Sequence, residues 1–204
     1  MGQLARVLVM LVFVAGAGLW AATWWREQAN PPSAVGVAVP GGVEIGGKFS
    51  LVAADGHTVT EADFRGRFML VYFGYTFCPD VCPTELQAVA ASLALLGDQA
   101  AKVAPIFITI DPERDTPKAM GEYTKLFDDR LIGLTGSAVQ IAQVAKAYRA
   151  YYARVEPKAG GTYLMDHSSF LYLIGPDGKF RALVKPGSTP EEIAALLRAQ
   201  FAHS

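Results

Sequence analysis

Two uninterrupted apolar runs constrain the fold of this chain most. The segments "FMLVYFGY" (68–75) and "VAPIFITI" (103–110) contain no charged residue. Continuous apolar runs of this length are typical of central strands that are buried on both faces of a sheet. The segment between them contains a predicted helix, and Pro83 can occupy its first turn. It then places apolar residues along one helical face, namely Leu86, Val89, Ala90, Leu93 and Leu96. The sequence therefore predicts a strand, a helix and a second strand in succession.

The remaining patterns alternate in the same way. Residues 48–64 predict two short strands around the turn Asp55-Gly56. A helix is expected from Thr116 to about Phe127, a strand in 131–136 and a helix in 139–152. Residues 169–184 predict a hairpin, and a capping box predicts a last helix that ends near Phe201, with the box formed by Thr189 and Glu192. The pattern indicates an α/β sandwich with a mixed central sheet and helices on both faces.

The amino-terminal segment differs from the rest of the chain. No charged residue lies between Val7 and Trp25, and a helix of that length spans roughly 28 Å, close to the hydrocarbon thickness of a bilayer. Its three tryptophans gather at the end near Trp25, and tryptophan favours the membrane–water interface. We therefore expect a transmembrane anchor in residues 1–26, with a cleaved signal peptide as the alternative.

The anchor prediction implies an organisation and a location. Residues 27–42 are rich in proline, glycine and small residues and predict a tether, so that residues 43–204 form the folded domain. Arg6 favours a cytoplasmic position for the short end. The expected location is the inner (cytoplasmic) membrane in a single pass, with the domain facing the periplasm or an equivalent exported space, where thiols can be oxidised.

Composition excludes several classes of protein. The chain has 204 residues, of which 51% are hydrophobic and 11% aromatic, which argues for a packed core rather than disorder. Its formal net charge of −1 provides no basic face for nucleic acid. Its two cysteines are too few for a disulfide scaffold.

Both cysteines lie in "GYTFCPDVCPTEL" (74–86), between the first predicted central strand and the helix that follows it. Cys78 and Cys82 are four residues apart, so both sulfurs share one face if the helix begins within this loop. The spacing permits a structural disulfide, a redox pair or two ligands of a metal site. A helix start stabilises negative sulfur and should lower the pKa of at least one thiol. Two inert core cysteines remain the plainest alternative.

Two sulfurs need a further ligand for most metals. His57 lies in a predicted turn and His203 beside the carboxyl terminus, whereas His167 directly precedes a predicted buried strand. If that strand lies beside the strand ending at Tyr75, the imidazole can face the sulfurs. Two thiolates and one imidazole suit Cu(I), and Cu(II) with an added oxygen ligand, whereas structural zinc normally takes four protein ligands.

Several acidic residues are weaker candidates. Asp80 and Asp166 are either additional ligands or ordinary turn and capping residues. The acidic residues in "TIDPERDTP" (109–117) follow a buried strand, where α/β proteins build sites. We favour a solvated acidic loop for these residues, which are Asp111, Glu113 and Asp115.

Three segments together resemble the Sco/SenC family of membrane-anchored copper proteins. They are "GYTFCPDVCPTEL", "IDPERDTP" (110–117) and "DHSSFLYLIGPDG" (166–178), and the resemblance runs from about Val43 to Phe201. It implies a thioredoxin-like fold. It also implies one copper ion, Cu(I) or Cu(II), per domain, held by Cys78, Cys82 and His167, with Cys78 and Cys82 forming a disulfide when oxidised.

The resemblance also implies a function. The chain is expected to be a membrane-anchored copper metallochaperone that delivers copper to, or prepares the thiols of, the CuA site in cytochrome c oxidase subunit II, or to serve other copper-accepting proteins. The alternative is a thiol-disulfide oxidoreductase that acts on exported cysteine proteins, with Cys78 and Cys82 as its redox pair. A peroxidase is disfavoured because Thr76 lies two residues before Cys78 rather than three. The expected partners are these proteins and the lipid bilayer, without nucleic acid.

Overall fold

The computed structural model describes residues 44–157 and 160–202, the backbone of residues 36–37, and four single positions in the amino-terminal segment, Gly2, Gly16, Gly18 and Trp20. The chain divides into two compact units, Met1–Ala34 and Val35–Ser204. Apart from single positions, the predicted anchor lies outside the described residues, as does His203. In the described part of the chain, no helix is long and apolar enough to cross a membrane.

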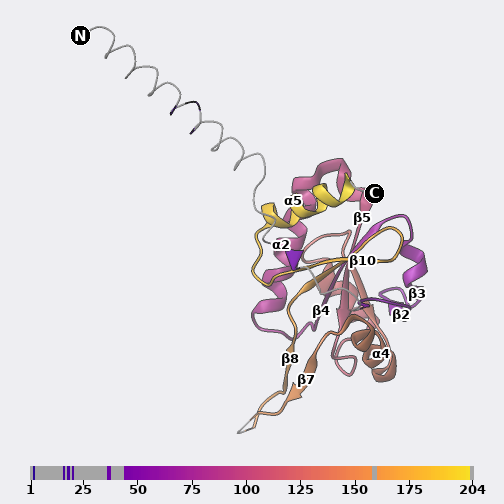
Figure 1. Ribbon diagram of the computed structural model, residues 1–204. Helices are drawn as coiled ribbons and strands as arrows, with labels where there is room; N and C mark the ends of the chain where they lie inside the picture. Colours follow the sequence, from indigo (N-terminus) through magenta and orange to yellow (C-terminus); the bar gives the residue numbers. More distant parts are fainter. Residues whose placement is uncertain are drawn as a thin grey trace. The chain divides into compact units, whose positions relative to one another are not determined.

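The unit Val35–Ser204 is built around an eight-stranded mixed sheet with the order β1-β10-β9-β4-β5-β6-β2-β3 among the described residues (Figure 1). The strands are β1 (Gly36–Val37), β2 (Ser50–Ala53), β3 (Thr58–Thr60), β4 (Phe68–Gly74), β5 (Val103–Thr109), β6 (Ile132–Thr135), β9 (Leu171–Ile174) and β10 (Phe180–Val184). The pairs β4–β5 and β5–β6 are parallel, and the other pairs are antiparallel. The predicted mixed sheet is therefore confirmed.

Helices cover both faces of this sheet. They are α2 (Val81–Leu96), α3 (Pro117–Thr124), α4 (Ala138–Tyr148) and α5 (Pro190–Phe201), with 3-10 segments η1 (Glu61–Phe64) and η2 (Gly97–Lys102). Every residue of β4 is buried, and neighbouring residues of a strand point to opposite faces. Phe73 contacts Tyr148 of α4, with ring centroids 5.4 Å apart. Phe68, five residues earlier, contacts Phe201 of α5 at 5.2 Å. The strand is therefore central, as its apolar run predicts.

Local signals set several element boundaries. The predicted capping box is present, because Thr189 Oγ1 accepts a hydrogen bond from the Glu192 amide and the Glu192 carboxylate accepts one from the Thr189 amide. The helix expected to reach Phe127 ends at Thr124. The helix expected in 139–152 ends earlier, because Arg149 adopts a left-handed conformation with φ of 55°.

A hairpin that sequence analysis missed follows α4. The strands β7 (Tyr152–Val155) and β8 (Leu164–His167) pair with each other in a separate two-stranded sheet, and Figure 1 shows them leading away from the main sheet. Neither strand contains a buried residue. The sequence therefore has no run of buried apolar residues, and no alternation of buried and exposed residues, that would mark the hairpin.

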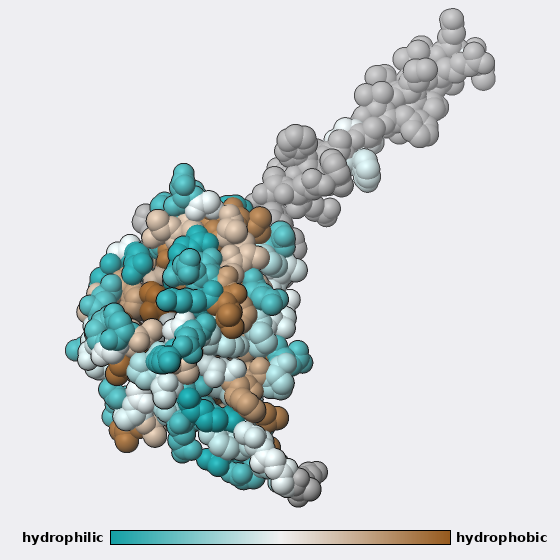
Figure 2. All heavy atoms as spheres, turned by 180° about the vertical axis from the view of Figure 1, so that it is seen from behind, coloured by the Kyte–Doolittle hydropathy of each residue, from teal (hydrophilic) through white to brown (hydrophobic). Residues whose placement is uncertain are grey.

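The edge of the sheet includes residues from the predicted tether. Gly36 pairs with Val184 and Val37 with Leu183, so β1 adds a short antiparallel strand beside β10. Figure 2 shows hydrophilic and hydrophobic residues interspersed over one face of the domain.

Candidate metal centre

Strand pairing brings His167 to the cysteine loop. β9 runs antiparallel to β4, with Tyr72 opposite Leu171. The residues just before β9 therefore lie at the carboxyl end of β4, where the cysteine loop begins. The condition set by the sequence, that these two strands lie side by side, is therefore met. His167 itself is the last residue of β8.

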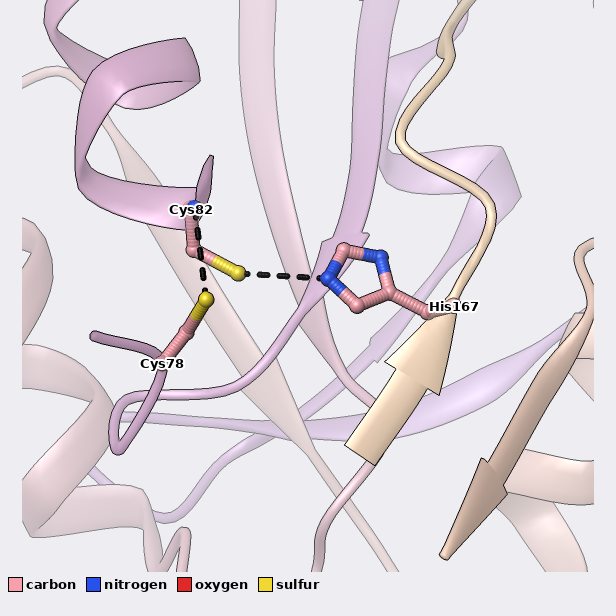
Figure 3. A group of neighbouring side chains, drawn as sticks. All are labelled: Cys78, Cys82 and His167. Carbon is pink, nitrogen blue, oxygen red and sulfur yellow. Dashed lines mark hydrogen bonds between the residues drawn. The ribbon is translucent and has the colours of Figure 1, made fainter. Parts of the chain in front are cut away.

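Figure 3 shows the three side chains converging. The Sγ atom of Cys82 lies 3.4 Å from Nε2 of His167. The backbone N–H of Cys82 donates a hydrogen bond to Sγ of Cys78 at 3.4 Å. The two sulfurs and one imidazole nitrogen all lie within 4.8 Å of one another. The sequence-predicted trio is therefore assembled in one place.

Packing fixes the orientation of each donor. Cys82 is fully buried in the first turn of α2, while Cys78 is partly exposed in the loop before it. Nδ1 of His167 lies 3.1 Å from the backbone oxygen of Ser168, which leaves Nε2 directed at the sulfurs. The rings of Tyr72 and Tyr75 lie edge-on to the imidazole, with centroids 6.0 and 6.1 Å away.

The last residue of β4 leaves room for the sulfur. A Cβ atom on Gly74 would lie 2.8 Å from Sγ of Cys82 and 2.8 Å from the ring of Phe107. Both distances are shorter than normal van der Waals contacts. A glycine is therefore required here if the Cys82 sulfur is to keep its position.

The two sulfurs differ electrostatically. The pKa of Cys78 is lowered to about 3, chiefly by a hydrogen bond from the Cys82 thiol and further by His167 and backbone amides, although burial opposes the shift. The pKa of Cys82 is raised by the hydrogen-bonded Cys78 sulfur and by burial. These shifts favour one thiolate beside one thiol, and their chief cause is the hydrogen bond that the two cysteines share. Both cysteines are free thiols in the structure, and the disulfide stays a prediction for the oxidised protein.

The donor set fits a single soft metal ion. Bonds of about 2.0–2.3 Å from nitrogen and sulfur to one ion place neighbouring donors roughly 3.5–4 Å apart. The measured separations, 3.4 Å for one pair and no more than 4.8 Å for any pair, need only small side-chain shifts to reach this spacing. Thiolates with few partners are the ligands that Cu(I) prefers.

His57 and the two candidate aspartates lie apart from this cluster. His57 is exposed and pairs with Asp55 in the β2–β3 turn. Asp80 and Asp166 are exposed, and neither belongs to the group of metal-binding side chains found among the described residues. Asp80 occupies the N-cap position of α2, and its backbone oxygen accepts a hydrogen bond from Thr84.

The interpretation of 109–117 as a solvated acidic loop is wrong for two of its three carboxylates. Asp115 is fully buried and Asp111 is 3% exposed, whereas Glu113 is exposed. Asp115 accepts hydrogen bonds from the amide and the hydroxyl of Thr76, at 3.0 and 2.6 Å, and from the hydroxyl of Thr109 at 2.6 Å. The carboxylate ties the cysteine loop to the end of β5. The position of Asp115 shortly after an apolar strand was the sequence signal for a functional or structural role. The sequence did not show that Thr76 and Thr109 are its hydrogen-bond partners.

The chain resembles known proteins over most of this domain. The "Protein sco1" of Schizosaccharomyces pombe is 41% identical over 169 residues, which are 81% of this chain and 64% of that protein. The solved structure of Bradyrhizobium japonicum ScoI with copper bound is 45% identical with a TM-score of 0.71, and the match covers 76% of this chain and 98% of that one. The chain thus spans just under two thirds of the length of its fission-yeast relative.

A more distant solved structure is also similar. The structure of BsSco is 26% identical with a TM-score of 0.60. BsSco is described as having "a disulfide switch" and as a member of the Sco family of cytochrome c oxidase assembly proteins. That match covers 80% of this chain and 96% of BsSco. The family profile described as SCO1/SenC matches residues 38–202, a range that contains the whole cysteine–histidine cluster. By this match and by the identity to its relatives, the chain belongs to the SCO1/SenC family.

Proposed function

We propose that this protein binds one copper ion through Cys78, Cys82 and His167 and takes part in cytochrome c oxidase assembly. It would deliver copper to the CuA site of subunit II or prepare the thiols of that site. The observation that carries the proposal is the convergence of two sulfurs and one imidazole within 4.8 Å. A relative with copper bound and a family member described as an oxidase assembly protein support it.

The chemistry of the site suits an ion that is carried rather than kept. Two soft thiolates and one imidazole give Cu(I) a stable site. Cys78 is partly exposed, so a recipient's ligands can approach the ion from the side of the loop. Cys78 already favours the thiolate form, and loading the metal then requires the loss of one proton from Cys82.

Copper titration of the reduced domain tests the ligand set. The unit Val35–Ser204, which has its own core, should bind one Cu(I) in competition with a chromophoric chelator. The variants His167→Ala and Cys82→Ser should each weaken binding at least tenfold, since even partners outside the ligand shell typically change metal affinity 10–100-fold.

The matched control is His57→Ala. His57 is an exposed histidine outside the cluster, so its loss should leave the affinity unchanged. Wild-type affinity in both ligand variants would refute the proposed ligands, and the absence of Cu(I) binding in the wild type would refute the proposed function.

A second candidate function is thiol-disulfide exchange on exported proteins. The observation that favours it is the pair of free thiols, one of which has a strongly lowered pKa. The reduction potential and the rate of exchange with a partner disulfide distinguish the two roles. Slow exchange together with tight copper binding would reject exchange as the main activity.

We also propose that residues 1–26 anchor the chain in the inner membrane, that residues 27–42 connect this anchor to the domain, and that the domain faces the periplasm or an equivalent space. The uncharged run between Val7 and Trp25 supports this arrangement. An exported domain would also explain a thiol pair that can be oxidised.

A further inference from the structure

The two halves of the cysteine–histidine cluster are held very differently. The cysteine loop joins β4 to α2, both of which pack in the core. His167 ends a hairpin whose strands contain no buried residue, and an isolated two-stranded ribbon is only marginally stable. At its base, Tyr151 and Ser168 exchange two hydrogen bonds, of 2.9 and 3.0 Å. Tyr152 and Met165 pack partly against the core, and a directed contact farther along the hairpin would fix its direction further.

Arg114 supplies a contact of this kind. Its guanidinium carbon lies 3.8 Å from the ring centroid of Tyr163, just before β8, and its Nη1 donates a hydrogen bond of 3.0 Å to the backbone oxygen of Tyr163. The same guanidinium lies 4.8 Å from the ring of Phe77 and 5.7 Å from that of Tyr75. Phe77 directly precedes Cys78. One side chain thus touches both the histidine hairpin and the cysteine loop.

A buried carboxylate holds the guanidinium in this position. Asp111, whose side chain is 4% exposed, pairs with Nε of Arg114. The hydroxyl of Tyr163 donates a hydrogen bond of 2.9 Å to the same carboxylate. Asp111, Arg114 and Tyr163 therefore contact one another, and a cation–π contact and directed hydrogen bonds restrict the guanidinium.

A second arginine reinforces the hairpin. Arg154 in β7 lies over the ring of Tyr163 at 3.6 Å, and its Nη1 contacts the carboxylate of Glu113 at 3.1 Å. Glu113 and Arg154 are both exposed, so this ion pair adds little by itself. The contacts of Arg114 differ from such a surface pair, because Arg114 pairs with a buried carboxylate.

We infer that Arg114 is a positioning residue, which holds the histidine hairpin against the cysteine loop so that Nε2 of His167 stays beside the Cys82 sulfur. The inference rests on the proposed copper site and adds a residue that does not touch the ion. Without the guanidinium, the hairpin keeps the contacts at its base, those of Arg154 and the partial packing of Tyr152 and Met165 against the core. It also keeps the hydrogen bond from Tyr163 to Asp111. The imidazole then samples positions away from the sulfurs, and affinity falls through the histidine alone.

A double-mutant cycle tests this coupling. Arg114→Met keeps an unbranched side chain but removes the planar donor, and it should weaken Cu(I) binding about tenfold. In a His167→Ala background the same replacement should have no further effect, because the ligand that it positions is already absent. Arg130→Met is the control, since Arg130 pairs with Asp128 in a turn between α3 and β6.

Hydrogen exchange on the metal-free protein gives an independent readout. In Arg114→Met, amides of β7 and β8 should exchange faster, while amides of β4 and β5 keep their protection. This measurement involves no copper, so it separates the two claims. Failure of the wild type to bind Cu(I) would end the proposed function, whereas the exchange result would still decide whether Arg114 holds the hairpin.

Three results would overturn the inference. The first is unchanged copper affinity and unchanged hairpin exchange in Arg114→Met. The second is an equal loss of affinity with and without His167, which would place the effect on the cysteine loop. The third is faster exchange throughout the sheet, which would reduce Arg114 to a general contributor to stability.

Discussion

At the scale of single residues, the site depends on a missing side chain as much as on its donors. Gly74 is the last residue of β4, and its empty Cβ position faces the Cys82 sulfur. Cys82 is fully buried, so the sulfur has little room to move away. The glycine thus controls the distance from the Cys82 sulfur to the histidine.

Replacing this glycine by alanine should therefore affect the site more than the fold. We expect Gly74→Ala to lower the free energy of unfolding by about 1–3 kcal/mol through overpacking and to weaken Cu(I) binding at least tenfold, because the new methyl group displaces the sulfur. Chemical denaturation and copper competition measure the two effects.

A matched control separates them. In Gly133→Ala, the new Cβ would lie 3.0–3.1 Å from atoms of Met120 and Thr124 in α3, away from the cysteine pair. This variant should lose stability but keep its copper affinity. If both variants lose affinity in proportion to stability, the steric role of Gly74 is wrong.

At the scale of elements, the site is a junction of three segments. The cysteine loop, the 111–115 loop and the β7–β8 hairpin come from distant parts of the chain, and side-chain contacts join them. Asp115 ties the first two segments by accepting three hydrogen bonds. Burial raises the pKa of its carboxyl group even though these hydrogen bonds lower it.

The raised pKa of Asp115 gives a signed pH dependence. The folded protein holds this proton more tightly than the unfolded chain, so the contribution of Asp115 to stability is full below about pH 3.9 and falls as pH rises through the folded pKa. The stability of the wild type relative to Asp115→Asn should therefore increase as pH is lowered from 7 towards 4. Denaturant unfolding at several pH values measures this difference.

The control for this prediction is Asp129→Asn, which changes an exposed aspartate and should leave the pH profile of the wild type intact. A stability difference between wild type and Asp115→Asn that stays constant from pH 4 to pH 7 would show that the carboxyl group titrates normally in the folded protein.

At the scale of the whole molecule, the unit Val35–Ser204 contains every donor of the site and a core that runs from Ile45 to Leu197. Copper binding and membrane attachment are therefore expected to be separable properties of the chain.

Deleting residues 1–26 should test this separation. We expect the truncated protein to move from the membrane fraction to the soluble fraction and to keep its melting temperature and Cu(I) affinity. A full-length variant, Leu11→Arg with Phe13→Arg, should also leave the membrane, since each central arginine adds about 2.5–3.5 kcal/mol to the free energy of insertion. Retention of the truncated protein on salt-washed membranes would contradict the proposed anchor.

The sequence by itself determined the central strands, a helix next to the cysteine loop and the capping box at Thr189, because each follows from a local pattern of burial or hydrogen bonding. The structure starts that helix at Val81, so that Cys82 lies inside it. It also marked Cys78, Cys82 and His167 as candidates. Only the tertiary structure decided that the imidazole meets the sulfurs, because that meeting depends on the antiparallel pairing of β9 with β4. The roles of Asp115 and Arg114 and the β7–β8 hairpin likewise depend on contacts between residues far apart in the chain, which no local pattern records.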